Sequence, residues 1–134
     1  MAIQFNASAR NAILQAIETE VRGSAVVEFR TGAQPASAGV ADSGTLLATM
    51  QLPADYLAAA SGGSSDKSGT WSTTVSAAGV PGYFRMKNSA ANVSYVQGAI
   101  TSTAGAGDLK FDAVDWVSGQ TVTINTWTFV AGNA

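Results

Sequence analysis

The residue types best suited to catalysis or metal binding in this chain are four carboxylates. Asp108, Asp112 and Asp115 form the densest acidic cluster, and Glu28 could complete a carboxylate pair or a calcium site with them. In a regular strand Asp108 and Asp112 share one face, while Asp115 points to the other. The spacing does not match an EF-hand loop, and no bidentate Glu follows it. Solvated strand edges explain these carboxylates better, so we expect no metal site and no acid–base catalysis.

Other catalytic chemistries are limited by the residue types that the chain lacks. It has no cysteine and no histidine, which excludes thiolate sites and any Ser-His-Asp arrangement within the chain. The segment Gly62–Ser68 superficially suggests a phosphate loop, but it lacks the Gly-Lys-Ser/Thr ending and precedes no clear helix. The composition of the whole segment Ser61–Gly69 predicts a flexible exposed loop. We therefore expect a protein that is not an enzyme and that uses no cofactor.

The three tryptophans allow two interpretations. Trp71, Trp116 and Trp127 fall on segments with β character, where they could form an aromatic platform for sugar rings or for the apolar groups of a partner. The alternative is that they pack in the core, which we consider the better explanation. Exposure distinguishes the two, because a sugar platform needs two or more coplanar exposed rings.

Charge and hydropathy limit the range of partners. Only 12% of the residues are charged and the formal net charge is −2, so no basic stripe for nucleic acid is present. No run approaches the 18 apolar residues of a membrane-spanning helix. The start, Met1–Asn6, lacks the basic and apolar regions of a signal peptide. We expect synthesis in a cytoplasm and no nucleic-acid or membrane partner.

One helix is predicted, over Asn6–Arg22. Ile13, Ile17 and Val21 repeat at every fourth residue and Leu14 lies beside them, which indicates an amphipathic helix. Asn6 or Ser8 can serve as its N-cap, and Gly23 is expected to end it.

After Gly23 the pattern changes to strands. Seven runs separated by turn residues favour β structure, over residues 25–31, 45–52, 70–77, 82–89, 93–103, 108–117 and 120–130. The runs over residues 82–89 and 93–103 are split by Asn88–Asn92 and are expected to form a hairpin. A single helical turn is expected at Pro53–Ala60. The spacing predicts a mainly β fold, an antiparallel β-sandwich or jelly-roll-like domain with one N-terminal helix. We expect one domain over residues 1–134, in which residues 1–23 form an N-terminal arm and the helix.

Several motifs spread over nearly the whole chain carry a resemblance to a known family. They are Met1–Ala12, Ala16–Thr19, Arg30–Gly32, Ala41–Ala48, Leu52–Asp55, Gly69–Ser72, Gly82–Arg85 and Gly132–Ala134. Together they resemble a family of small virion structural proteins of tailed bacteriophages and prophages. The resemblance implies a structural subunit of the virion, made in the bacterial host cytoplasm, and supplies no catalytic residues. It leaves the position on head, neck or tail open.

The function expected from these observations is docking. A capsid decoration or cement protein, or a head–neck accessory subunit, would bind copies of itself and other virion proteins, such as major capsid, neck or tail proteins. The alternative is a tail- or fibre-associated carbohydrate-binding module that recognises a receptor.

The docking residues are expected in the N-terminal segment. They are Ile3, Phe5, Ile13, Leu14, Ile17 and Val21. Ile3 and Phe5 precede the helix in a segment too short to complete a sheet alone. They form either an arm that lies on a neighbour or an edge strand of their own domain.

Overall fold

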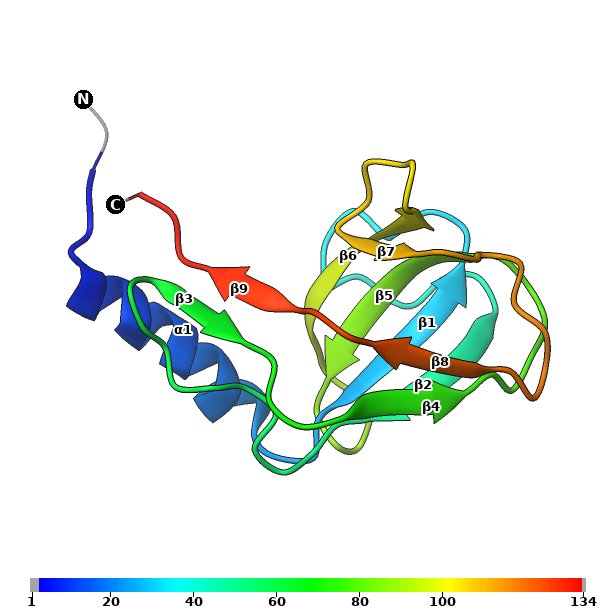
Figure 1. The fold of residues 1–134 in the computed structure, drawn as a ribbon, viewed down its shortest axis with the longest axis horizontal. Helices are drawn as coiled ribbons and strands as arrows, with labels where there is room; N and C mark the ends of the chain where they lie inside the picture. The colour runs from blue at the N-terminus through cyan, green and yellow to red at the C-terminus, as the bar shows by residue number, and fades with distance from the viewer. Residues whose placement is uncertain (1–2, 134) are drawn as a thin grey trace.

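The computed structural model describes residues 3–133, and within them it contains one helix and nine strands (Figure 1). Their bounds are α1 Ala7–Val21, β1 Val26–Thr31, β2 Leu46–Gln51, β3 Ser64–Asp66, β4 Trp71–Thr74, β5 Pro81–Lys87, β6 Ser94–Ser102, β7 Leu109–Phe111, β8 Thr121–Ile124 and β9 Thr128–Val130. The mainly β, sandwich-like fold with one N-terminal helix is confirmed.

Helix α1 forms where the apolar repeat predicts it. The side chain of Asn6 accepts a hydrogen bond from the backbone N–H of Ala9 at 2.9 Å, which caps the first turn. The left-handed residue that ends the helix is Arg22, with φ of 69°, and not the expected Gly23. Gly23 serves a different purpose, because a Cβ there would lie 2.9 Å from the carbonyl oxygen of Ala54.

The largest element is a five-stranded sheet with the order β2-β1-β5-β6-β7. Its first four strands pair antiparallel, and β7 pairs parallel with β6. Strands β5 and β6 form the hairpin predicted around Asn88–Asn92. One face of this sheet is apolar and carries Val27, Phe29 and Met86. The sheet is curled (Figure 1).

A two-stranded sheet, β4-β8, completes the core beside β2. It contributes the buried side chains of Trp71, Val122 and Ile124. Trp116 packs edge-to-face on Phe29, with their ring centroids 5.4 Å apart. Apolar burial of this kind is the main favourable term in folding.

The second two-stranded sheet, β3-β9, lies beside α1 and away from the main sheet (Figure 1). Two side chains of the helix hold it. Arg10 donates from Nε to the carbonyl of Ala131 at 2.7 Å, and Asn11 accepts from the N–H of Gly63 at 2.8 Å. We call α1, β3, β9 and the arm at residues 3–6 the protrusion.

Three local predictions are wrong. The segment Ser61–Gly69 is not a flexible exposed loop, because it contains β3, in which Ser65 is only 3% exposed. The run from Gln120 to Val130 is not one strand, because β8 pairs with β4 and β9 with β3, in different sheets. Pro53–Ala60 forms no helical turn, since Tyr56 and Leu57 enter the core in an irregular conformation.

Two buried tyrosines differ in how their hydroxyls are satisfied. The hydroxyl of Tyr56 is buried without a hydrogen-bond partner among residues 3–133. Burial raises the pKa of Tyr56 to about 12, and the charge of Glu18 adds to the rise. The hydroxyl of Tyr83 donates to the carbonyl of Ser43 at 2.6 Å.

We expect Tyr56→Phe to leave the free energy of unfolding unchanged or to raise it by up to about 1 kcal/mol, because it removes an unsatisfied buried hydroxyl. Tyr83→Phe, the matched control, should lower that free energy by about 1–3 kcal/mol, because it leaves the backbone groups of Ser43 without their partner. Urea denaturation of both variants measures the difference. An equal loss in the two would show that Tyr56 has a partner.

Candidate docking surfaces

The N-terminal arm, residues 3–6, stands away from the core. Ile3 is 76% exposed and Phe5 is 40% exposed. Neither lies in a strand, so residues 3–6 are not an edge strand of their own domain. The backbone N–H of Phe5 donates to the carbonyl of Asn133 at 2.7 Å, which holds the arm beside the end of the chain. Met1 and Ala2, expected in the arm, lie outside the described residues.

The apolar face of α1, which we call the helix stripe, consists of Ile13, Leu14, Ile17 and Val21 and is divided between the core and the surface. Leu14 and Val21 are buried, at 3% and 1% exposure, and therefore hold α1 on its own domain. They cannot meet a partner, which corrects their assignment as docking residues. Ile17 is partly buried against the core, while Ile13 remains 46% exposed. Of the four predicted positions, Ile13 is thus the most open to a partner.

The tryptophans do not form an exposed platform. Trp71 and Trp116 are 0% and 2% exposed, and their indole N–H groups donate to the carbonyls of Ser68 and Ala113. Their assignment to an aromatic platform is therefore corrected to core packing. Trp127 is half-buried, and its ring is tilted by 50° from that of Trp71.

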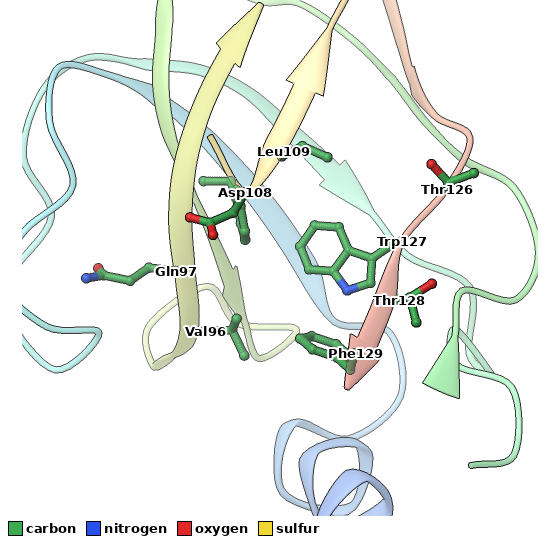
Figure 2. A pocket seen from close by; sticks show the side chains of 9 residues that line it. Val96, Gln97, Asp108, Leu109, Thr126, Trp127, Thr128 and Phe129 are labelled. Atoms are coloured by element: carbon green, nitrogen blue, oxygen red, sulfur yellow. The ribbon is translucent and has the colours of Figure 1, made fainter. Parts of the chain in front are cut away.

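Trp127 lines a groove of about 470 Å³ between β6 and the segment that leads into β9 (Figure 2). Val96 and Gln97 lie on the β6 side, and Phe129 lies on the β9 side. Ring contacts build the floor, with Phe84 packed edge-to-face on Trp127 at 4.9 Å between centroids. We call this the β6–β9 groove.

A second hollow, of about 360 Å³, lies between α1 and the start of β6. It is lined by Ile13 and Ile17 from the helix and by Tyr95 and Val96 from β6. Because Val96 also lines the β6–β9 groove, the two hollows adjoin each other. The helix stripe and the groove therefore form one continuous surface, which is apolar at the helix and of mixed polarity in the groove.

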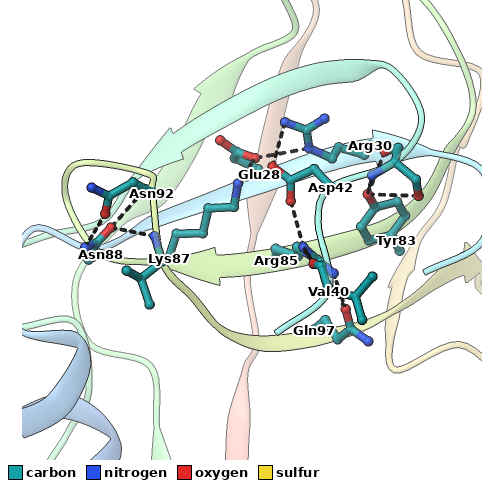
Figure 3. A network of polar contacts seen from close by, with 12 residues as sticks. Glu28, Arg30, Val40, Asp42, Tyr83, Arg85, Lys87, Asn88, Asn92 and Gln97 are labelled. Carbon is teal, nitrogen blue, oxygen red and sulfur yellow. Dashed lines mark hydrogen bonds and ion pairs between the residues drawn. The ribbon is translucent and has the colours of Figure 1, made fainter. Parts of the chain in front are cut away.

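The other face of the five-stranded sheet carries a cluster of charges (Figure 3). Lys87 lies 2.8 Å from Glu28 and 2.6 Å from Asp42, measured from Nζ to the carboxylate oxygens. Arg30 contacts the same two carboxylates at 3.1 and 3.2 Å. Arg85 is 2.8 Å from Asp42. We call these five residues the charged cluster.

The loop at residues 32–44 covers this cluster. Arg85 is 2% exposed, and its guanidinium donates to the carbonyls of Ser37 and Val40, to Asp42 and to the side chain of Gln97. Every N–H of the guanidinium can thus be satisfied within the chain. The cluster holds the loop on the sheet and leaves Arg85 no donor for a ligand.

The electrostatics of Asp42 follow from these contacts. Burial alone would raise the pKa of its carboxyl, but the hydrogen bond from Lys87 and the charges of Arg30 and Lys87 outweigh this and lower the pKa. Asp42 therefore stays ionised at neutral pH, as a counter-ion should.

The four carboxylates considered for catalysis or metal binding do not lie together in the structure. Asp108 accepts a hydrogen bond from the backbone N–H of Ala99 at 2.9 Å, at the edge of β6. Glu28 lies in the charged cluster, and Asp112 and Asp115 are exposed. Between residues 3 and 133 no group of three His, Cys, Asp or Glu side chains could hold a metal ion.

Sequence reasoning missed the β6–β9 groove and the charged cluster. The cluster had a signal, because Glu28 and Arg30 alternate on one strand as Arg85 and Lys87 do on the next. The groove had none, since Val96 and Phe129 look like ordinary strand residues.

Comparison with known proteins finds no matching family model, curated protein or solved structure. In the described part of the chain, no helix is long and apolar enough to cross a membrane.

Proposed function

We propose that this chain is a non-enzymatic structural protein of a tailed-phage virion, a capsid decoration or cement protein or a head–neck accessory subunit. The observation that carries the proposal is the exposed apolar surface of the protrusion, where Ile3, Phe5 and Ile13 are between 40% and 76% exposed. Ile13 also lines the apolar hollow between α1 and β6, and an exposed apolar patch of this kind favours a surface that a partner covers. The motif resemblance to phage virion proteins supports the setting.

The arrangement of polar groups also supports a structural role. The buried charges are paired within the chain, and the carboxylates that could have formed a catalytic pair are apart. A charged cluster that ties a loop to a sheet stabilises a fixed shape, which suits a subunit present in many copies. The partners would be other copies of this chain and major capsid, neck or tail proteins.

The carbohydrate-binding alternative loses support from the burial of Trp71 and Trp116. Trp127 alone remains, and it packs edge-to-face on Phe84 and Phe129. A single ring wedged between two others offers little flat area for a sugar.

The proposal can be tested with a tailed phage that encodes this chain. A small tag is added to the protein, and the phage particles are purified. We expect the protein to band with the particles in a density gradient in many copies, and gold-labelled antibody to mark the head or neck. Ile13→Asp should reduce the amount bound about tenfold, because it places a charge in an apolar contact. Val117→Asp, at a residue that is 60% exposed outside the protrusion, is the matched control.

Absence of the protein from the particles would contradict the proposal. Label confined to fibre tips, with binding lost on addition of host sugar, would favour the carbohydrate-binding alternative instead.

A further inference from the structure

We propose that a pocket beside the charged cluster binds a small oxyanion, with inorganic phosphate as the simplest example. The bound anion would balance a positive charge that the cluster leaves over. Residues of one chain form the whole pocket, so the inference goes beyond the proposed function and does not depend on the virion setting.

The charged cluster, drawn in Figure 3, is not neutral. It holds three cations but only two carboxylates, so one positive charge is in surplus. The side chains of Arg85 and Lys87 are 2% and 5% exposed, and water and salt therefore screen this surplus poorly. Charges removed from water need counter-charges, and one further anion would complete the set.

The pocket lies against the two most deeply buried cations of the cluster. It has a volume of about 270 Å³ and is lined by Arg85 and Lys87 from β5, by residues 38–42 of the covering loop and by residues 91–94 at the turn into β6. Asp42 is the only carboxylate among its lining residues in the described chain, and the cluster already uses it. The pocket therefore has room for an anion beside cations that lack one.

The walls of the pocket offer hydrogen-bond donors that the chain leaves unused. Lys87 has three N–H hydrogens and contacts two carboxylate oxygens, so one hydrogen remains for a ligand. The hydroxyl of Ser94 is buried without a hydrogen-bond partner among residues 3–133. Within the same described residues, the backbone N–H groups of Gly39 and Ala41 donate to no other group. An anion with several acceptor atoms would satisfy donors of this kind.

The placement of these donors favours an anion with several oxygen atoms. They lie on three segments, namely β5, the covering loop and the start of β6. The oxygens of a tetrahedral ion can accept hydrogen bonds from several directions, and hydrogen bonds to an ionised acceptor are the strong ones. A chloride ion is a single atom and is too small to reach donors on all three walls. Arg85 adds its charge alone, because its N–H groups are already used within the chain.

Isothermal titration calorimetry with sodium phosphate tests the inference. The full chain is kept in sodium chloride at a constant ionic strength, so that general screening contributes equally throughout. We expect saturable binding of one phosphate per chain and no saturable heat when sodium chloride is titrated instead. Absence of saturable phosphate binding overturns the inference.

A carboxylate placed on the pocket wall should compete with the bound anion. Ala91 lines the pocket and has a left-handed backbone, with φ of 56°, which Asp and Asn both adopt more readily than other residues with side chains. We expect Ala91→Asp to weaken phosphate binding about tenfold, because like charges repel each other at short range. The matched control is Ala91→Asn, which has the same shape without the charge and should leave the affinity within about twofold of the wild type.

A second variant removes a donor without removing a contact within the chain. Ser94→Ala deletes a hydroxyl that has no partner in the described structure, so it should not lower the melting temperature. It should weaken phosphate binding about tenfold, the effect of losing one hydrogen bond to a charged group. Circular dichroism and thermal melting confirm that each variant folds. Equal affinity in Ala91→Asp and Ala91→Asn, or wild-type affinity in both Ala91→Asp and Ser94→Ala, overturns the inference.

Glycerol 3-phosphate distinguishes a free phosphate ion from a phosphoryl group on a larger molecule. Binding about tenfold weaker than that of inorganic phosphate would mean that the pocket takes the free ion, whereas equal or tighter binding would mean that it accepts the ester. Both results keep the pocket as an oxyanion site. Phosphate binding by a protein that never joins particles would reject the virion function alone, and particle binding without phosphate binding would reject the pocket alone.

Discussion

Replacing Asp42 with asparagine is expected to lower the free energy of unfolding by about 3 kcal/mol, because it leaves the buried guanidinium of Arg85 without a counter-ion and leaves Glu28 alone to balance Arg30 and Lys87. The side chains of Arg85 and Lys87 are 2% and 5% exposed, so water cannot replace the lost charge. Breaking a buried ion pair typically lowers the free energy of unfolding by about 3–5 kcal/mol. We expect the lower end of this range because the Asp42 side chain is 27% exposed. Urea denaturation measures the change.

The matched control is Asp112→Asn, which removes the same charge from an exposed side chain. It should change the free energy of unfolding by no more than about 0.5 kcal/mol. A similar loss in both variants would show that net charge, and not the cluster, accounts for the effect.

The stability of the wild-type protein should also depend on pH through Asp42. Its pKa is lowered in the folded state, so its contribution is fully present above the unfolded value of about 4 and is lost as the pH falls through the folded pKa. In Asp42→Asn this part of the acid dependence should disappear. An unchanged acid profile in the variant would contradict the assignment.

Trp71→Ala and Trp116→Ala are expected to lower the free energy of unfolding by about 3–5 kcal/mol each, because each leaves a large cavity in the core. Small domains have only about 5–15 kcal/mol in total, so both variants should be partly unfolded at moderate temperature. Thermal melting followed by far-UV circular dichroism measures the effect. Trp127→Ala, at a half-buried ring, should cost less.

The opposite result would support the carbohydrate-binding alternative. If Trp71→Ala melts like the wild type but no longer binds an immobilised glycan, the ring would be a recognition residue. We expect loss of stability without any change in glycan retention.

Elements with strong local signals could be predicted from the sequence. The helix follows from its apolar repeat and from Asn6, whose side chain caps it as expected. The β5–β6 hairpin follows from two β-rich runs around Asn88–Asn92. In these cases the residues that determine the structure lie within one turn or hairpin of each other.

The other elements depend on contacts with segments that lie far away in the sequence. Ser64 to Asp66 is polar and follows two glycines, and it becomes a strand only because β9 lies beside it. The charges of Arg85 and Lys87 indicate a solvated face until the loop at residues 32–44 covers them. Local pattern cannot reveal burial that another segment creates.

The same limit applies to the docking surface. The apolar repeat predicts which face of the helix is apolar, but it does not predict which residues of that face are buried. Leu14 is buried and Ile13 is exposed, although both fit the repeat. The β6–β9 groove depends on where β7 stops pairing with β6, which the sequence does not mark.

The link from Arg10 to Ala131 joins residues 121 positions apart, and this has a consequence for how the chain acquires its shape. Contacts between distant segments form late, because closing a long loop costs entropy before the contact can repay it. During synthesis α1 emerges well before β9, because eight strands separate the two in the sequence. The protrusion is therefore expected to order only after β9 has been made, so that a chain whose synthesis has not reached β9 has no finished surface with which to associate.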